Sequence, residues 1–222
     1  MAKQVLVLVV LLCVAPLSAL AQKADVGFVV GASFTSDSTI RVTCPGTLPC
    51  TIILPVEGFG TIHPDHRIFL EGAFGVRLLD AKLASLHLEL PVAGIPSQPL
   101  TVKVLSVLST TPFDHLSSVY VTPAIKVKLL PAASFSPWGS IGGGVAHFSS
   151  DSGVSTNKGA LQFGGGVDIK TNIPLLGFRA EVRDFLTGDP HTANFLGVPS
   201  LTTESGLHRH NLLVGGGVVL RF

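Results

Sequence analysis

The chain has 222 residues, of which 46% are hydrophobic and only 13% are charged, and its formal net charge is +1. A nucleic-acid partner held by a basic surface is therefore not expected. The mean hydropathy of +0.54 is high for a water-soluble secreted protein, yet beyond the N-terminal segment no stretch approaches the ~18 uninterrupted apolar residues of a spanning helix. Hydrophobicity spread over short alternating segments is instead typical of a sheet that presents every second residue to lipid.

The first 21 residues have the pattern of a secretory signal peptide. Lys3 supplies a positive charge, residues 5–15 form an apolar run, Pro16 ends the run, and the small residues at 19–21 suit cleavage before Gln22. A transmembrane anchor is the alternative, but the run is well short of the ~20 residues that a helical span needs. We therefore expect residues 1–21 to be removed and residues 22–222 to form one domain.

Two cysteines follow the expected cleavage site, Cys44 and Cys50. Export to an oxidising compartment favours a disulfide between them. The alternative is a metal site that includes His63 and His66, but no paired C-x-x-C spacing supports it. The disulfide is the prediction, and no metal or cofactor is expected.

Eight segments of alternating residues follow one another along the mature chain. Successive side chains of a strand point to opposite faces, so each segment has an apolar face and a more polar one. Residues 100–108 also alternate; we expect them to extend the third segment, and an additional pair of strands is the alternative. The eight predicted strands are residues 24–34, 67–79, 83–90, 116–129, 138–148, 159–170, 177–186 and 208–222.

The gaps between these segments are alternately long and short. In outer-membrane barrels the periplasmic turns are short and the extracellular loops are longer, and an even strand number places both ends of the chain on the periplasmic side. The pattern predicts an all-β fold, an eight-stranded antiparallel transmembrane up-and-down β-barrel. The long gaps are residues 35–66, 91–115, 149–158 and 187–207, and the short ones are 80–82, 130–137 and 171–176.

Charged residues of both signs lie on the faces opposite the apolar ones. Each would cost about 2–4 kcal/mol if it faced hydrocarbon near the midplane, so we expect them to point inward and neutralise one another. Eight strands leave an interior just wide enough for side chains to fill, which favours a packed polar interior over an ion path. The predicted lumen polar network is Arg67, Glu71, Arg77, Glu89, Lys126, Asp168, Arg179, Glu181 and Arg183.

Glycine triplets and aromatic residues complete the strand pattern. The triplets at residues 142–144, 164–166 and 215–217 are interpreted as making room for Arg and Glu side chains and easing curvature. None opens a helix or precedes Lys-Ser or Lys-Thr, so a phosphate-binding loop is not indicated. An interfacial aromatic belt is predicted from residues near strand ends, namely Tyr120, Trp138, Phe148, Phe178, Phe185 and Phe222.

The last segment ends in an aromatic residue on its apolar face. The segments FGGGVDIK (163–170), GFRAEVRDFL (177–186) and LLVGGGVVLRF (212–222) resemble small outer-membrane β-barrel proteins of the OmpA-like and OmpX-like type. The resemblance implies location in the bacterial outer membrane and an assembly signal formed by Leu220 and Phe222. It implies no single activity, because such barrels act as structural proteins, as adhesion or immune-evasion surfaces and occasionally as lipid-modifying enzymes.

We therefore expect a non-enzymatic, monomeric protein that acts as a structural or surface-interaction protein through its extracellular loops. Its expected partners are outer-membrane lipid and lipopolysaccharide, the barrel-assembly machinery during biogenesis and an extracellular partner of the loops. The alternative is a lipid-modifying hydrolase, which needs a nucleophile, a base and an orienting acid within hydrogen-bond reach. Candidates near the expected outer rim are His63, Asp65, His66, Asp189, His191, Glu204, Ser205, His208, Arg209 and His210.

Overall fold

The computed structural model describes residues 24–36, 38–42, 58–64, 66–104, 107–108, 114–151, 153, 155–188, 201–203 and 209–222. Within these ranges the chain forms strands and turns, and no helix there has the length and apolar character to cross a membrane. The predicted signal peptide and the predicted Cys44–Cys50 disulfide lie outside the described residues.

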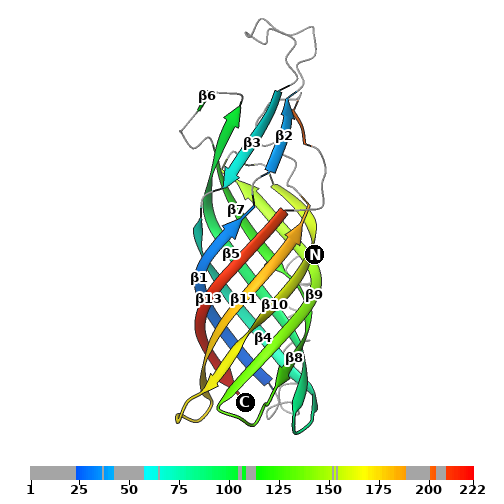
Figure 1. Cartoon of the computed structure of the whole chain (residues 1–222), viewed down its shortest axis with the longest axis vertical. Helices are drawn as coiled ribbons and strands as arrows, with labels where there is room; N and C mark the ends of the chain where they lie inside the picture. Colours follow the sequence, from blue (N-terminus) through cyan, green and yellow to red (C-terminus); the bar gives the residue numbers. More distant parts are fainter. Residues whose placement is uncertain are drawn as a thin grey trace, which may run out of the picture.

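Eight antiparallel strands close into a barrel (Figure 1). The first strand pairs with the last, from Asp25 opposite Arg221 to Thr35 opposite Asn211, so the barrel has no open edge at its seam. The predicted eight-stranded antiparallel barrel is confirmed. In order around the wall, the strands are β1 (Ala24–Thr35), β4 (Arg67–Asp80), β5 (Ala84–Val104), β7 (Asp114–Val121) with β8 (Ala124–Leu129), β9 (Phe135–Ser150), β10 (Ser155–Lys170), β11 (Leu176–Thr187) and β13 (Arg209–Arg221).

One barrel strand is interrupted, because β7 and β8 are separated by Thr122 and Pro123. Proline has no N–H to donate to a neighbouring strand, so it interrupts regular pairing. Both halves nevertheless pair with β5 on one side and β9 on the other. The Gly143 N–H also donates to the Pro123 carbonyl at 3.1 Å, so the wall stays closed at the interruption.

The two ends of the barrel differ in their connections. Three short turns, at residues 81–83, 130–134 and 171–175, lie at the same end as the C-terminus (Figure 1), where the Phe222 N–H donates to the Ala24 carbonyl. This end is called the turn end. The opposite end is called the loop end. One predicted long loop is short: residues 151–154 alone connect β9 and β10, because these strands stay paired as far as Ser149 opposite Ser155.

The sheet continues beyond the barrel at the loop end. β5 is 21 residues long, and its last residues pair with β3 (Gly58–Pro64), which pairs with β2 (Ser38–Val42), which pairs with β12 (Leu201–Thr203). We call β2, β3, β12 and residues 100–104 the projecting sheet (Figure 1). The predicted extension of the third strand is therefore confirmed as far as Val104, while β6 (Val107–Leu108) pairs back onto Lys103 and Val104.

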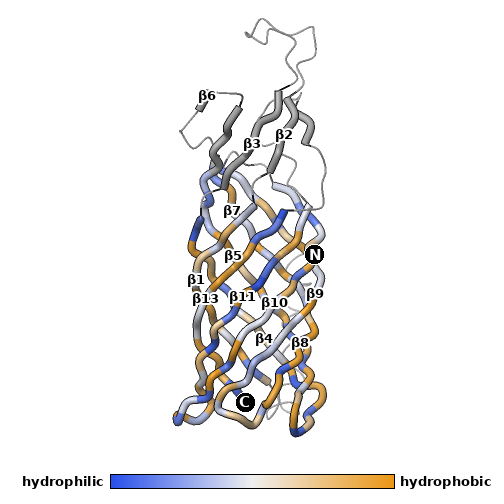
Figure 2. The backbone as a smooth tube through the Cα atoms, in the orientation of Figure 1, coloured by the Kyte–Doolittle hydropathy of each residue, from blue (hydrophilic) through white to orange (hydrophobic). Residues whose placement is uncertain are grey.

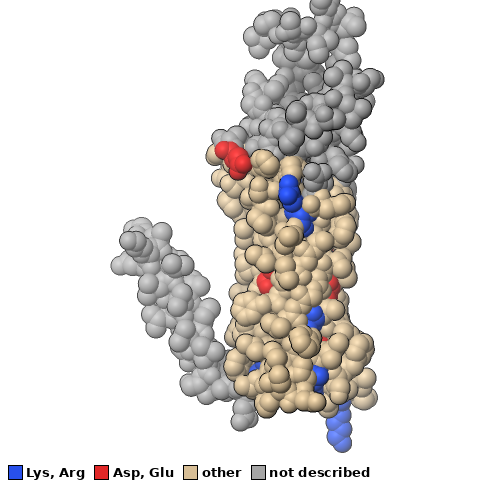
Figure 3. Space-filling model, turned by 90° about the vertical axis from the view of Figure 1, so that its left-hand side faces the viewer, with Lys and Arg blue, Asp and Glu red and all other residues tan. Residues whose placement is uncertain are grey.

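Large apolar side chains cover the outside of the wall. Ile68 is 64% exposed and Leu70 is 60% exposed, and similar residues project from each of the other barrel strands. Figure 2 shows apolar positions recurring along the barrel strands, and on the face that Figure 3 shows only a few charged residues interrupt the wall between the two ends. An apolar surface of this extent is untenable in water and suits a hydrocarbon environment.

The interior has an ionic layer nearer the turn end and an apolar tier nearer the loop end, where buried polar groups of Gln98, Arg209 and Asn211 also lie. The predicted polar interior is thus incomplete, because the alternation that sends Arg183 inward also sends Phe185 inward from the same strand. Aromatic and aliphatic groups can fill this half without needing polar partners. The apolar tier consists of Val29, Phe69, Ala93, Ile95, Leu116, Tyr120, Ala146, Phe148, Ala160, Phe185 and Leu213.

The predicted aromatic belt is largely wrong for the same reason. Tyr120, Phe148 and Phe185 are fully buried in the apolar tier, and Trp138 is 5% exposed inside the barrel. Phe178 and Phe222 do face outward, with exposed fractions of 52% and 48%. Position near a strand end suggested the lipid interface, but the face on which the residue lies decided its environment.

Candidate functional site

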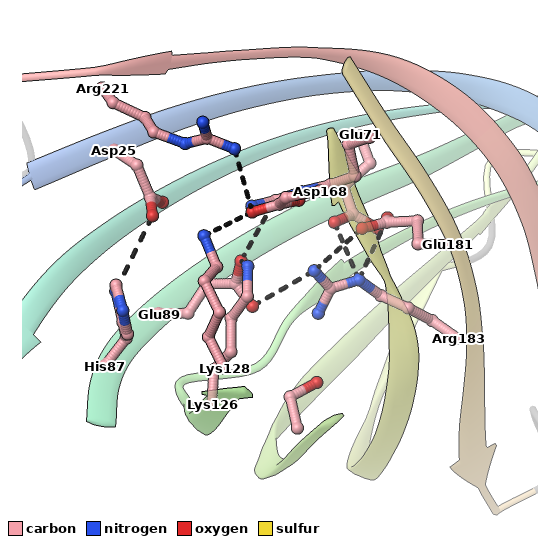
Figure 4. Close-up of polar contacts among 12 residues, drawn as sticks. Asp25, Glu71, His87, Glu89, Lys126, Lys128, Asp168, Glu181, Arg183 and Arg221 are labelled. Atoms are coloured by element: carbon pink, nitrogen blue, oxygen red, sulfur yellow. Dashed lines mark hydrogen bonds and ion pairs between the residues drawn. The ribbon is translucent and has the colours of Figure 1, made fainter. Parts of the chain in front are cut away.

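Glu89 of β5 lies at the centre of an ion network that fills the half of the interior nearer the turn end (Figure 4). It is 1% exposed. Its Oε1 accepts hydrogen bonds from Lys126 Nζ at 2.8 Å and Arg179 Nη1 at 3.2 Å, and its Oε2 accepts one from Arg183 Nη2 at 3.1 Å. One carboxylate cannot neutralise three cations, so the network requires further acidic groups.

Asp168 of β10 supplies the second anionic centre and is fully buried. Arg179 lies directly across the sheet and donates from Nε to Oδ1 at 2.8 Å and from Nη2 to Oδ2 at 3.2 Å. Lys128 Nζ lies 2.5 Å from Oδ2. A bidentate Arg–carboxylate pair adds geometric specificity to charge attraction, so the β10–β11 register fixes this part of the network.

Arg183 joins Glu89 to two other acids. Its Nε lies 3.0 Å from Glu71 Oε1 and 3.1 Å from Glu181 Oε1. The network then holds four acidic groups, Glu71, Glu89, Asp168 and Glu181, and four basic ones, Lys126, Lys128, Arg179 and Arg183. Contact between opposite charges makes burial of so many ions tolerable, because an unpaired buried charge is strongly destabilising.

Trp138 of β9 packs against the cations of this network. Lys126 Nζ lies 4.2 Å from the ring centroid, and the guanidinium carbons of Arg183 and Arg179 lie 5.2 and 5.3 Å away, distances at which a cation is attracted to an indole face. A Cβ at Gly166 would approach the ring to 2.7 Å. This glycine therefore makes room for the tryptophan ring.

Seven of the nine predicted network residues lie together in this cluster. Arg67 does not, because it is exposed at the loop end of β4, beyond the polar layer. Arg77 does not either: the β4–β5 register shifts next to it, and its Nη1 binds Asp80 Oδ2 at 2.6 Å near the turn end. The sequence pattern gave the correct face for both positions but not their height along the barrel. The seven that meet are Glu71, Glu89, Lys126, Asp168, Arg179, Glu181 and Arg183.

The predicted assembly signal lies at the seam of the barrel. Leu220 pairs with Val26 of the first strand and with Leu176 of β11. Phe222 lies two residues further along, and its N–H donates to the Ala24 carbonyl at 2.8 Å. The two residues thus complete the closing pair of strands.

A second group of polar residues lies on the outer wall near the loop end. His210 Nδ1 is 2.6 Å from Asp184 Oδ2. Ser36 lies across the sheet: its N–H donates to the His210 carbonyl at 2.9 Å, and its Oγ accepts from the His210 N–H at 3.0 Å. An acid, an imidazole and a hydroxyl therefore share one patch, although the hydroxyl is bonded to backbone.

The other predicted rim candidates contribute little to this patch. Arg209 points inward and is 5% exposed, and the His66 ring lies 4.8 Å from the Phe34 ring. His63 belongs to β3 of the projecting sheet. Across the described part of the chain, no three His, Cys, Asp or Glu side chains are placed to hold a metal ion. The remaining candidates, Asp65, Asp189, His191, Glu204, Ser205 and His208, lie outside the described residues.

Solved structures with this architecture are outer-membrane proteins. The outer membrane protein OprG from Pseudomonas aeruginosa superposes with a TM-score of 0.54 at 14% identity, covering 90% of this chain and 98% of that chain. The chain therefore has the fold of small outer-membrane β-barrel proteins. By the lengths of the connections, the turn end corresponds to the periplasmic end of such barrels and the loop end to the extracellular end.

Two further solved structures have a lower similarity to this chain. Neisserial surface protein A has a TM-score of 0.46 at 13% identity, covering 88% of this chain and 97% of that chain. The outer membrane protease OmpT from Escherichia coli has a TM-score of 0.46 at 6% identity, covering 90% and 97%. No family model and no curated protein sequence matches. At these identities the likeness concerns the fold alone.

Proposed function

We propose that this barrel is a non-enzymatic protein that acts as a structural or surface-interaction protein through its extracellular side. The observation that carries the proposal is the projecting sheet, in which β5 continues past the barrel and pairs with β3, β2 and β12 in turn. Loops on a rigid scaffold are where recognition usually lies. The barrel wall then anchors the protein in outer-membrane lipid and lipopolysaccharide. The barrel-assembly machinery inserts the barrel there during biogenesis.

A filled interior supports an anchoring role over transport. The apolar tier carries fully buried Phe69, Tyr120, Phe148 and Phe185 across one half of the lumen, and fully buried Arg179 and Arg183 lie in the other half. Tyr120 packs on Phe185 with ring centroids 4.6 Å apart and meets Phe148 edge-on at 6.1 Å. A solute would have to displace both layers to cross.

Two measurements test this proposal. In planar lipid bilayers the purified barrel is expected to give no single-channel openings, and a stable conductance would overturn the filled-interior argument. In cells that display the protein, the strands β2 and β3 are replaced by a Gly-Ser linker and cell-to-cell association is followed by settling. Loss of association in a variant that still shows heat-modifiable migration is expected, whereas unchanged settling would remove the surface-interaction role.

A lipid-modifying hydrolase is the second candidate, favoured by the pairing of His210 with Asp184 beside Ser36. A carboxylate that orients an imidazole near a hydroxyl is the arrangement of an activated nucleophile. Lipid A from cells expressing wild-type protein, His210→Ala, Asp184→Asn or Ser36→Ala is compared by mass spectrometry. A wild-type-dependent change in lipid A that each substitution abolishes would establish the enzyme, and identical lipid A in all four samples would eliminate it.

A further inference from the structure

A cavity of about 80 Å³ lies inside the turn end of the barrel, below the ion network. This exceeds the ~10–15 Å³ that one water molecule needs, so a group of several heavy atoms fits. Its lining residues come from most of the barrel strands, so it lies within the lumen at the periplasmic mouth. The polar residues that line it are Asp25, Arg77, Ser85, His87, Lys128, Ser136, Lys170 and Arg221.

The charges around this cavity are unbalanced. Four basic side chains line it, from Arg77, Lys128, Lys170 and Arg221, and the lining carboxylate is that of Asp25. Arg77 and Lys128 pair with Asp80 and Asp168, which are not lining residues, so Lys170 and Arg221 supply the excess positive charge. An enclosed concentration of positive charge attracts an anion.

Hydrogen-bonding capacity is also left over at the cavity. Arg221 Nε and Arg77 Nε are buried and have no hydrogen-bond partner among the described residues. Arg221 Nη2 is 3.7 Å from Asp168 Oδ2, which is beyond hydrogen-bond distance, and Lys170 Nζ has one described acceptor, the Ala132 carbonyl at 2.9 Å. The three residues, from β4, β10 and β13, all line this cavity.

A buried histidine adds a further unsatisfied group. His87 is 4% exposed, and its Nε2 lies 3.0 Å from Ser85 Oγ. Its Nδ1 has no hydrogen-bond partner in the described structure and lies 3.7 Å from Asp25 Oδ2. Asp25 Oδ1, an acceptor, is also buried without a hydrogen-bond partner in the described structure. Buried polar atoms are normally satisfied by protein, water or ligand, so an occupant of the cavity would supply acceptors to the arginines and a donor to Asp25, as a protonated oxyanion can. Figure 4 shows His87, Asp25 and Arg221 at this edge of the network.

We infer that the periplasmic mouth is a binding site for a phosphate oxyanion, held by Arg77, Lys170 and Arg221. A phosphate presents several acceptor oxygens to guanidinium and ammonium donors. Its source is free phosphate or the headgroup of a phospholipid in the adjacent inner leaflet, since basic pockets at membrane surfaces bind anionic headgroups. This inference does not depend on the proposed extracellular function.

The test uses the full barrel refolded in a maltoside detergent without phosphate. Isothermal titration calorimetry follows binding of inorganic phosphate in one arm and of short-chain phosphatidylglycerol below its micelle concentration in the other, at constant ionic strength. The variants are Arg221→Gln and Lys170→Gln, and Lys82→Gln is the matched control, because Lys82 is exposed in a neighbouring turn and does not line the cavity. Heat-modifiable migration verifies folding of each variant.

Saturable binding in at least one arm is expected, weakened tenfold or more by Arg221→Gln or Lys170→Gln and less than twofold by Lys82→Gln. Binding confined to the lipid arm identifies a headgroup as the ligand, and binding confined to the inorganic arm identifies free phosphate. The absence of saturable binding in both arms overturns the inference. Equal weakening by all three substitutions also overturns it, because it would show only a general charge effect.

Discussion

Replacing Glu89 with Gln tests whether charge balance holds the interior together. Glu89 accepts hydrogen bonds from Lys126, Arg179 and Arg183. The amide keeps the shape and one acceptor oxygen but removes the negative charge. Arg179 retains Asp168, and Arg183 retains Glu71 and Glu181. Lys126 loses the carboxylate to which it donates, so the cost falls mainly on this buried ammonium.

The expected loss of stability is large. At a separation near 3 Å and an effective dielectric constant of ~20, each ion contact contributes about 5 kcal/mol of attraction, most of which offsets the cost of removing the charges from water. Removing one member of a buried pair usually costs about 3–5 kcal/mol net. We expect the free energy of unfolding of Glu89→Gln to fall by about this amount.

The assay is urea unfolding of the barrel in lipid vesicles, followed by tryptophan fluorescence. The chain has a single tryptophan, Trp138, whose ring lies against Lys126, so the signal reports on the network itself. The control is Asp80→Asn, which breaks the exposed Arg77–Asp80 pair and is expected to cost only ~0–1 kcal/mol.

A second substitution separates charge balance from local packing. In Glu89→Gln with Lys126→Met, the unpaired ammonium is gone, so most of the lost stability is expected to return. If Glu89→Gln unfolds within about 1 kcal/mol of wild type, or if the double variant is no more stable than Glu89→Gln, the charge-balance reasoning fails.

Three other expectations concern the wall, the glycines and the C-terminus. Val30→Arg puts a charge on the outer face and should cost about 2–4 kcal/mol in urea titrations, whereas Leu83→Arg, in a turn, should cost under about 1 kcal/mol; equal costs would contradict a hydrocarbon-facing wall. Gly215→Ala should cost about 1–3 kcal/mol by overpacking, because its Cβ would meet Phe69 Cζ at 2.7 Å, while Gly216→Ala, with no neighbour nearer than 3.6 Å, should be close to neutral; similar values would refute the packing argument. Deletion of Phe222 should reduce the heat-modifiable barrel in outer-membrane fractions more than Phe178→Ala does, and matching yields would argue against an assembly signal.

The number of strands and their inner and outer faces could be predicted from the sequence. The side chains of a strand alternate between its two faces. Because the outer face of each barrel strand meets lipid and the inner face meets ions and other buried groups, the sequence of each strand alternates between apolar residues and the residues of the interior. Phe28, Leu70 and Ile141 therefore face outward, and Glu71 and Arg183 face inward. The alternation of long and short gaps then set the strand order, since up-and-down neighbours pair with one another.

Height along the barrel could not be predicted in the same way. Arg67 shares a face with Glu71, but it lies at the rim and is exposed, while Arg77 lies beside a shift in register. The predicted aromatic belt was wrong for most of its residues because it was based on their position near strand ends and not on the face of the strand on which each residue lies. Phe185 lies two residues beyond Arg183, and the alternation places both inside.

The sequence by itself determined that the chain forms a closed sheet with an apolar exterior, because periodicity is a local property that each strand carries alone. Only the tertiary structure decided which inward groups meet. Glu89 receives hydrogen bonds from Arg179 and Arg183, which follow it by 90 and 94 residues. The stagger between neighbouring strands brings such residues to one level, and that stagger is a property of the whole closed barrel. Closure of the barrel also places the apolar tier next to the ion network. It brings cationic side chains from several strands to one cavity at the periplasmic mouth.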